Sequence, residues 1–356
     1  DADAAADAFD ATLVVAPDGE RWRAARGAAP PEARFLVRTS GTAGAPRWIA
    51  LSDANVRAVL DSHVPLLALD GATVLSVLPW HHVFGLVLQL LAALDRGATL
   101  VREASHGRDP DAMLAAAAAH GGTHLDAVPH TVRRLAERAD DRALLRALRG
   151  GIVGGALADA AIARALSDTR LRVGYGQTEA APGICLGEPA EWRAGHLGRP
   201  LGCAVRRDDD GVLAFRGPNA CVGEWADGAL RVLPPDRWVR TGDLAVLEAD
   251  GSWTYEGRLG DAFKLANGRH VAAAAVEEAV KAAFPAVREA LLSSPDGVAL
   301  LLAVTAEGAP PGAADVAPLL GGLAGRPLRV VAVAADAWVR TPKGELDRRH
   351  PAGRPG

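Results

Sequence analysis

Between residues 73 and 175, short apolar segments alternate with longer segments rich in Ala, Leu and Arg. Alternation of this kind is typical of parallel βα units, so it constrains the chain to an α/β fold. We expect strands at 73–78, 99–101, 125–128, 151–153 and 171–175, and helices at 83–93, 110–119, 131–138 and 158–166. A further helix is expected at 52–60, with Ser52 as its N-cap.

The sequence changes in character after about Gly198. Short strand-like segments follow, and the turn signals Asp208-Asp209-Asp210-Gly211 and Asp250-Gly251 separate them. From about Asp261 the chain has one amphipathic helix at 274–284 and several more strand-like segments. We therefore predict a large domain over residues 1–257 that ends in a β-rich subdomain, and a small α+β domain over residues 261–356.

Composition excludes several classes of protein. With 49% hydrophobic residues a sizeable core is available, and a net charge of −4 does not favour nucleic-acid binding. No apolar run reaches the roughly 18 residues of a membrane-spanning helix. The three cysteines have no metal-binding spacing, and nothing near Asp1 resembles a signal peptide. We expect a cytoplasmic protein in a reducing compartment.

Several catalytic motifs are missing. The chain has no Gly-x-Ser-x-Gly elbow and no Gly-x-x-x-x-Gly-Lys-Ser/Thr loop, which argues against a serine hydrolase of that type and a P-loop NTPase. Gly174-Tyr175-Gly176 lacks the third glycine of a dinucleotide fingerprint. His120 and His124 have the spacing of a helical metal pair, but the two glycines between them make a helix there improbable.

The segment 39–47 is a glycine-rich loop between a predicted strand at 35–37 and the helix at 52–60. It combines small hydroxyls, glycines and a cation, namely Thr39, Ser40, Gly41, Thr42, Gly44 and Arg47. Exposed backbone N–H groups, hydroxyls and a positive charge are what a polyphosphate needs. Taken alone, the segment is equally compatible with an ordinary Ser/Gly turn.

Further motifs follow in a fixed order: Tyr-Gly-Gln-Thr-Glu at 175–179, Thr-Gly-Asp at 241–243, Gly-Arg-Leu-Gly-Asp at 257–261 and Thr-Pro-Lys-Gly-Glu at 341–345. Together with the loop they resemble the adenylate-forming superfamily of acyl-CoA synthetases, peptide-synthetase adenylation domains and luciferases. Residues 79–85 and 154–156 resemble two more segments of that superfamily. The resemblance extends from about residue 35 to residue 349.

This resemblance implies a two-step reaction. A carboxylate attacks the α-phosphorus of ATP, which gives an acyl-adenylate and pyrophosphate. The thiol of CoA, or the phosphopantetheine of an acyl carrier protein, then takes the acyl group. The segments around His82, Gly155 and residues 183–186 carry no acidic residue placed for an amino group, so an aryl or aliphatic acid is favoured over an amino acid.

The resemblance also assigns roles to residues. Glu179 would hold Mg²⁺, and Thr178 and the loop hydroxyls would bind phosphates. The nucleotide would contact Gly155, Tyr175 and Gly176, and its ribose would contact Asp243, with Arg258 close by. The acyl pocket would include His82, Gly154 and Ala156, and Asp261 would be the hinge of the small domain.

The catalytic lysine of such enzymes lies near the C-terminus. This chain has three lysines, Lys264, Lys281 and Lys343, and its other 36 basic residues are arginines. Lys343 is therefore the favoured candidate, because a retained lysine suggests a site that guanidinium cannot fill. Its order relative to Gly344 is reversed from the common pattern, so an alternative is that Glu345 occupies the slot and adenylation is impaired.

Three departures keep a second interpretation open. Arg47 replaces the loop lysine, Ala43 replaces a threonine, and only 38 residues precede Thr39 where a further subdomain is usual. The N-terminal subdomain is then shortened, naturally or by truncation, and a homodimer could cover the exposed surface. The alternative function is a catalytically weak homologue that binds a nucleotide or acyl-adenylate, or a partner scaffold.

Lys343→Ala is expected to abolish acid-dependent ATP–pyrophosphate exchange but to retain thioester formation from synthetic acyl-adenylate, because only adenylation would use that face of the small domain. Both half-reactions are measured separately. Lys281→Ala is the control, since no motif surrounds it. Normal exchange by Lys343→Ala would show that the catalytic lysine lies elsewhere.

Overall fold

The structure, a computed structural model, describes residues 13–16, 19–22, 33–39, 47–226, 229–259, 262–266, 270–294 and 296–338. The chain forms two compact units. The larger comprises Asp1–Arg206, Ala214–Thr241 and Leu247–Thr254, and the smaller comprises Arg207–Leu213, Gly242–Val246 and Tyr255–Gly356. The division therefore falls within strands rather than at a single linker.

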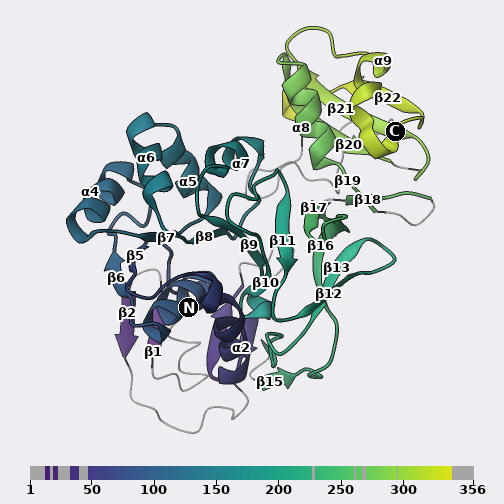
Figure 1. Ribbon diagram of the computed structural model, residues 1–356. Coiled ribbons are helices and arrows are strands. Elements are labelled where there is room, and N and C mark those ends of the chain that lie inside the picture. The colour runs from purple at the N-terminus through teal and green to yellow at the C-terminus, as the bar shows by residue number, and fades with distance from the viewer. Residues whose placement is uncertain are drawn as a thin grey trace. The chain divides into compact units, whose positions relative to one another are not determined.

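A layer of parallel strands, divided between two hydrogen-bonded sheets, lies in the larger unit (Figure 1). Its strands are β5 (Thr73–Ser76), β6 (Thr99–Arg102), β7 (His124–Asp126), β8 (Ile152–Gly154) and β9 (Arg172–Gly176). β5 pairs in parallel with β6 and β7, β8 pairs in parallel with β9, and parallel bridges connect the β7 and β8 regions. The predicted α/β class with parallel βα units is confirmed.

The helices of this unit mostly match the predicted segments. They are α2 (Asp53–His63), η1 (Val64–Leu66), η2 (Phe84–Leu91), α3 (Ala92–Asp95), α4 (Pro110–His120), α5 (Pro129–Ala136), α6 (Ala139–Ala147) and α7 (Ala160–Leu166). Ser52 caps α2 through a reciprocal capping box with Asn55, as expected from its position. Two details differ from the prediction: η2 is a π-helix that continues into α3, and α6 was not predicted.

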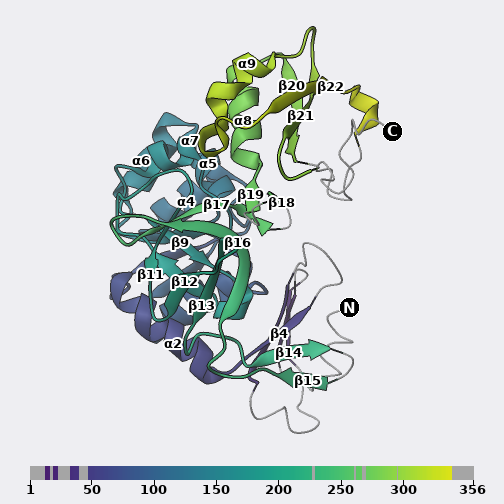
Figure 2. The same cartoon turned by 90° about the vertical axis from the view of Figure 1, so that its right-hand side faces the viewer.

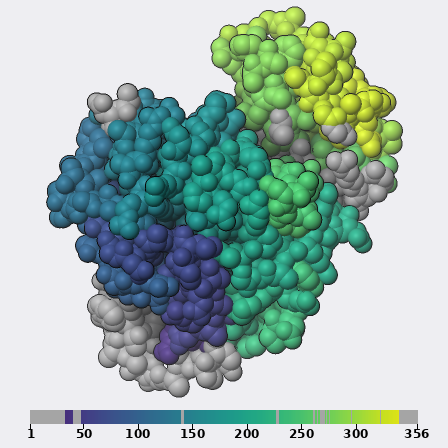
Figure 3. Space-filling model, viewed as in Figure 1, coloured from purple at the N-terminus to yellow at the C-terminus, as the bar shows by residue number. Residues whose placement is uncertain are grey.

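Alternate side chains of the sheet are buried on opposite faces. Val74 and Ile152 belong to one apolar cluster with residues of α2, η2 and α3. Their neighbours Leu75 and Val153 belong to a second cluster with residues of α4, α5, α6 and α7. Successive strand residues point to opposite faces, so these runs of apolar residues require helices on both sides. In the space-filling view the blue and teal segments of the larger unit lie together on the face that is shown (Figure 3).

Antiparallel strands follow the parallel ones. A turn of 3-10 helix, η3 (Thr178–Ala180), comes first. The strands after it are β10 (Gly183–Leu186), β11 (His196–Pro200), β12 (Ala204–Arg207), β13 (Val212–Arg216), β16 (Val239–Leu247) and β17 (Trp253–Arg258). The sheet has the order β12-β13-β16-β17-β11-β10-β9-β8. Gly211 and Gly251 have φ of 91° and 80° at the two predicted turns, where a left-handed conformation favours glycine. The expected β-rich region is confirmed.

A second, smaller sheet has the order β15-β14-β4-β3. It consists of β3 (Phe35–Arg38), β4 (Trp48–Leu51), β14 (Gly223–Ala226) and β15 (Ala229–Val232), and Figure 2 shows β4, β14 and β15 side by side. β1 (Leu13–Ala16) and β2 (Gly19–Trp22) form a separate hairpin. β3 and β4 flank the predicted phosphate loop, so the sheet holds both ends of that loop.

The smaller unit has the predicted α+β composition. Its C-terminal part contains β18 (Ala262–Lys264), β19 (His270–Ala272), α8 (Ala274–Ala283), β20 (Val287–Ser293), β21 (Leu300–Ala306), α9 (Ala313–Val316), η5 (Ala317–Leu323), β22 (Leu328–Ala332) and η6 (Ala335–Ala337). β20, β21 and β22 form a sheet, and Val280 of α8 and Leu302 of β21 are fully buried in one cluster. Among the described residues of the whole chain, no helix is long and apolar enough to cross a membrane.

Asp126 is a buried carboxyl group at the end of β7. Its Oδ1 accepts a hydrogen bond from the Ile152 N–H at 2.8 Å. Burial raises the pKa of Asp126 to about 7 because it penalises the charged form, and the Ile152 hydrogen bond opposes this rise only in part. Between pH 4 and 7 the folded protein therefore holds a proton that the unfolded chain has released, and stability decreases as pH rises through this range.

Asp126→Asn keeps an oxygen acceptor for Ile152 and removes the buried charge. We expect its stability relative to the wild type to improve by on the order of 3 kcal/mol between pH 4.5 and pH 8. Urea unfolding at both pH values measures the difference, with the exposed Asp70→Asn as control. A stability difference that does not change with pH would contradict the buried charge.

Candidate functional site

A pocket of about 380 Å³ opens in the larger unit at the carboxyl ends of the parallel strands. Leu78 follows β5, Val128 follows β7, and Gly154 and Gly176 end β8 and β9. In α/β sheets ligands bind at this edge, because the loops that leave the strands there converge on one crevice. The helices α2 and η2 and the strand β10 complete the walls.

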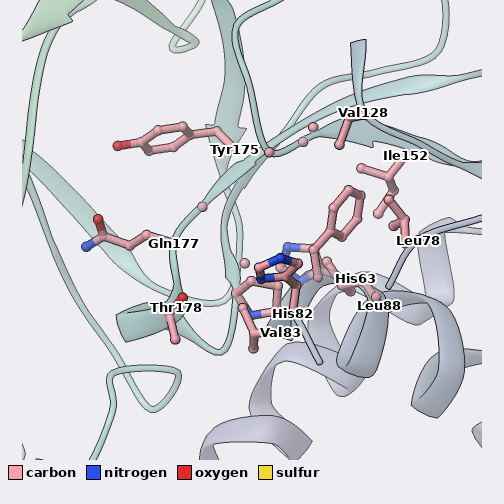
Figure 4. A pocket seen from close by; sticks show the side chains of 18 of the residues that line it. His63, Leu78, His82, Val83, Leu88, Val128, Ile152, Tyr175, Gln177 and Thr178 are labelled. Carbon is pink, nitrogen blue, oxygen red and sulfur yellow. The ribbon is translucent and has the colours of Figure 1, made fainter. Parts of the chain in front are cut away.

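The pocket has an apolar end and a polar end (Figure 4). Leu78, Leu88, Val128 and Ile152 gather on one side, and Tyr175, Gln177 and Thr178 lie on the other. Among the described residues that line the pocket, none is Asp, Glu, Lys or Arg. An apolar group can therefore be buried at one end while polar groups remain available at the other.

Two histidines line the pocket between these ends, and both are neutral near pH 7. His63, at the C-terminus of α2, is buried, and burial lowers its pKa to about 4. Its Nδ1 lies 3.2 Å from the carbonyl oxygen of Val59 and 2.9 Å from the Ser62 hydroxyl. Desolvation also lowers the pKa of His82, although this residue is exposed at its surface. The pocket thus carries no buried positive charge from imidazole.

The structure brings several predicted residues together in this pocket. His82, Gly154 and Gly155 line it, and so do Tyr175, Gly176 and Thr178. Ala156 is exposed and is not among the lining residues. His63 was not predicted, because it belongs to no motif and lies beyond the helix expected at 52–60, which the structure extends to Asp53–His63.

Glycine is required where backbones approach at the pocket wall. A Cβ at Gly176 would lie 1.6 Å from the Pro182 carbonyl oxygen, and one at Gly154 would lie 2.5 Å from that of Gly174. Backbone atoms cannot move aside as a flexible side chain can. These motif glycines therefore allow the neighbouring backbone segments to pack in direct contact.

Arg47, Glu179 and Glu224 form an ion-paired group beside the predicted phosphate loop. Nη2 of Arg47 lies 2.7 Å from Oε1 of Glu179, and Nη1 lies 2.8 Å from Oε1 of Glu224. Glu179 lies on η3 and Glu224 on β14, so three distant segments of the chain meet here. Arg47 and Glu179 were predicted site residues, whereas Glu224 was missed because it lies in no motif.

The donor set fits a Mg²⁺ ion. Mg²⁺ in enzymes that bind phosphates is usually held by one or two carboxylates together with substrate oxygens. The carboxylate of Glu179 is mostly buried, with 16% of its side chain exposed, and Thr178 beside it supplies a hydroxyl. Over the described ranges no group of three or more His, Cys, Asp or Glu side chains could form a protein-only metal site.

The base of the predicted loop is closed by hydrogen bonds. The Thr39 N–H and hydroxyl both donate to the Arg47 carbonyl oxygen, at 2.8 and 3.3 Å. The loop residues Ser40, Gly41, Thr42 and Gly44 lie outside the described residues, as do the predicted hinge Asp261 and the predicted catalytic Lys343.

The predicted ribose-binding pair lies within the smaller unit. Asp243 on β16 is 6% exposed, and its Oδ1 lies 3.4 Å from Nη1 of Arg258 on β17. The Arg258 guanidinium therefore lies close to the Asp243 carboxylate, as expected, and the ribose-binding role of the pair stays a prediction.

The predicted absence of a helical histidine pair is also supported. α4 ends at His120, and Gly121 adopts a left-handed conformation with φ of 64°. His124 lies on β7, where its Nε2 bonds the Leu67 carbonyl oxygen at 3.0 Å. The two residues therefore do not share a helix face.

Gly183 provides a test of the pocket wall, because a Cβ there would lie 2.4 Å from Nε2 of His63. We expect Gly183→Ala to destabilise the protein by about 1–3 kcal/mol through overpacking. The same change in a His63→Ala background is expected to cost less, since the obstructing ring is gone. Chemical denaturation of the four proteins measures this coupling; equal costs in both backgrounds would contradict the contact.

Curated relatives match most of this chain. A feruloyl-CoA synthase from Amycolatopsis sp is 28% identical over 286 residues, which cover 74% of this chain and 56% of the relative. A 2-succinylbenzoate–CoA ligase from Bacillus cereus is 29% identical over 275 residues, covering 73% of this chain and 56% of the relative. The chain thus spans about half the length of the curated relatives it matches.

Solved structures share the fold. The ATP-bound MatB structure from Rhodopseudomonas palustris has a TM-score of 0.67 at 23% identity, covering 92% of this chain and 69% of the other. o-Succinylbenzoate CoA synthetase from Bacillus subtilis, in complex with its acyl-adenylate intermediate, has a TM-score of 0.66 at 23% identity, covering 88% and 68%.

The family model of the AMP-binding enzymes matches residues 4–221, more than half of the chain and the whole pocket lining. The parallel sheet, the pocket at its carboxyl edge and the Tyr175–Glu179 segment all lie in this region. On this match, the chain belongs to the AMP-binding enzyme family.

Proposed function

We propose that the protein activates a small aryl or aliphatic carboxylic acid with ATP to an acyl-adenylate and transfers the acyl group to the thiol of CoA. The observation that carries this proposal is one pocket with an apolar end beside a polar end formed by Tyr175 and Thr178, next to the Arg47–Glu179 pair. The names of the relatives, feruloyl-CoA synthase and 2-succinylbenzoate–CoA ligase, support CoA as acceptor. A carrier-protein phosphopantetheine presents the same thiol and is the second acceptor to test.

The lining of the pocket supports an acid without an amino group. An ammonium group buried among Leu88, Val128 and Ile152 would need a carboxylate partner, and the lining supplies none. Burying an unpaired charge is strongly unfavourable. An aromatic ring or aliphatic chain loses nothing there and gains from leaving water.

The chain's charged groups suit the adenylation step. Negative charge accumulates on the phosphates as pyrophosphate leaves, and a guanidinium at Arg47 can bind two phosphate oxygens at once. Glu179 would hold Mg²⁺, which supplies charge neutralisation on the phosphate oxygens when bound. The pocket would hold the acid close to Thr178, so positioning and electrostatics provide most of the catalysis. In the smaller unit, the Asp243 carboxylate would accept hydrogen bonds from the ribose hydroxyls.

We further propose that residues 261–356 pivot at Asp261 and deliver Lys343 to the reacting carboxylate. The support is the Gly-Arg-Leu-Gly-Asp segment at 257–261 and the lysine in a chain that otherwise uses arginine. A mobile small domain would allow one pocket to serve adenylation and thioester formation in turn.

Glu179→Gln keeps the shape of the side chain but removes its negative charge. We expect acid-dependent ATP–pyrophosphate exchange to fall at least ~100-fold, comparable to removal of a principal electrostatic contact in an active site. The assay uses a panel of aryl and aliphatic acids, with phenylalanine as the amino-acid comparison.

Glu188→Gln is the matched control, because Glu188 is an exposed carboxylate paired with Arg172 at 2.9 Å. A wild-type protein that binds ATP but exchanges pyrophosphate with no acid would favour the weak-homologue alternative. A Glu179→Gln variant with the wild-type rate would remove Glu179 from the site.

A further inference from the structure

Arg47 contacts two carboxylates that have different structural settings. Glu179 lies on η3, a single turn of 3-10 helix that directly follows the Tyr175–Gln177 wall of the pocket. Glu224 lies in the middle of the sheet β15-β14-β4-β3, away from the pocket lining. The two ion pairs, at 2.7 and 2.8 Å, are equally short but are held by different parts of the fold.

The sheet fixes Glu224 with respect to Arg47. Glu224 is in register with Ile49 of β4 on one side and with Arg231 of β15 on the other. Arg47 directly precedes β4, and its carbonyl oxygen is bonded by Thr39 at the end of β3. Arg47 therefore lies at the start of β4, and Glu224 lies on β14, the strand that pairs with β4. The contact with Glu179 instead joins the start of β4 to η3, which belongs to no strand of this sheet.

Arg47 has to give up one of its two carboxylate contacts when it binds a polyphosphate with both terminal nitrogens. One guanidinium faces two carboxylates, so Arg47 cannot bind a polyphosphate with its full fork while both contacts persist. If Glu179 turned to Mg²⁺, Nη2 of Arg47 would become free for phosphate oxygens, and Nη1 would remain on Glu224. Without Glu224, the half-exposed Arg47 side chain would lose its anchor and would have to be ordered by the ligand itself.

We propose that Glu224 is a positioning residue, which holds Arg47 toward the polyphosphate while Glu179 exchanges its partner. The proposal rests on the proposed function for its ligand, a magnesium–nucleoside triphosphate. It assigns to Glu224 no contact with the substrate: its effect on binding passes through Arg47.

Glu224→Ala is expected to weaken Mg·ATP binding about tenfold, since a charge-assisted hydrogen bond orders the binding side chain. Glu224→Gln retains an oxygen acceptor for Nη1 and is expected to lose less. Isothermal titration calorimetry with Mg·ATP, and with magnesium pyrophosphate alone, measures both without need of turnover. In the exchange assay, the expected loss appears in the KM for ATP more than in kcat.

The decisive experiment is a double-mutant cycle with Arg47→Ala. In that background Glu224→Ala is expected to change the affinity for Mg·ATP by less than about twofold, because the residue through which it acts is gone. Glu307→Ala removes a comparable exposed pair, with Arg288 at 2.8 Å, and serves as the control. Thermal unfolding of each variant separates loss of positioning from loss of fold, and Glu224→Gln covers the case in which the alanine variant does not fold.

Unchanged or tighter Mg·ATP binding by Glu224→Ala would overturn the proposal, because Glu224 would then merely sequester Arg47 or repel phosphate. An equal loss in the Arg47→Ala background would also overturn it, and so would a wild type that binds neither ATP nor pyrophosphate. If the wild type exchanges pyrophosphate with no acid but the cycle behaves as expected, the proposed function fails and the role of Glu224 stands.

Discussion

Burial of the parallel sheet on both faces is the constraint on which the site depends. Val74 and Ile152 face the cluster that α2, η2 and α3 complete, while Leu75 and Val153 face the one that α4 to α7 complete. With both faces covered, only the edges of the sheet remain for a ligand, and the crossover connections bring every parallel strand to the same carboxyl edge. The pocket lies at that edge, where the loops that leave the strands converge.

The chemistry of the pocket follows from what the strands carry as they end. At Gly154 and Gly176, neighbouring backbone segments approach more closely than a Cβ would permit. These close backbone contacts form part of the pocket wall. The apolar end contains no charged side chain, and burial keeps His63 and His82 neutral near pH 7. A site of this kind can bury the uncharged body of a ligand at one end and offer polar groups at the other.

Charge is concentrated beside the pocket rather than within it. Arg47 pairs with Glu179 on η3 and with Glu224 on β14. The cation of the predicted phosphate loop is therefore held by one carboxylate from the turn after β9 and one from the sheet that contains β4. Such partly exposed ion pairs contribute little to stability. They place one guanidinium and two carboxylates together beside the predicted phosphate loop.

The sequence by itself determined the class of fold, the family and most of one wall of the site. Apolar alternation predicted the parallel strands, and Tyr175, Thr178 and Glu179 could be identified because a local motif carries them. It did not reveal His63, whose role arises only when the end of α2 packs against Gly183. It did not reveal Glu224, because 177 residues separate it from Arg47 and their contact depends on the pairing of β14 with β4. A motif records residues that are close along the chain, whereas strand register decides which distant side chains meet, and that register is set by the packing of the whole unit.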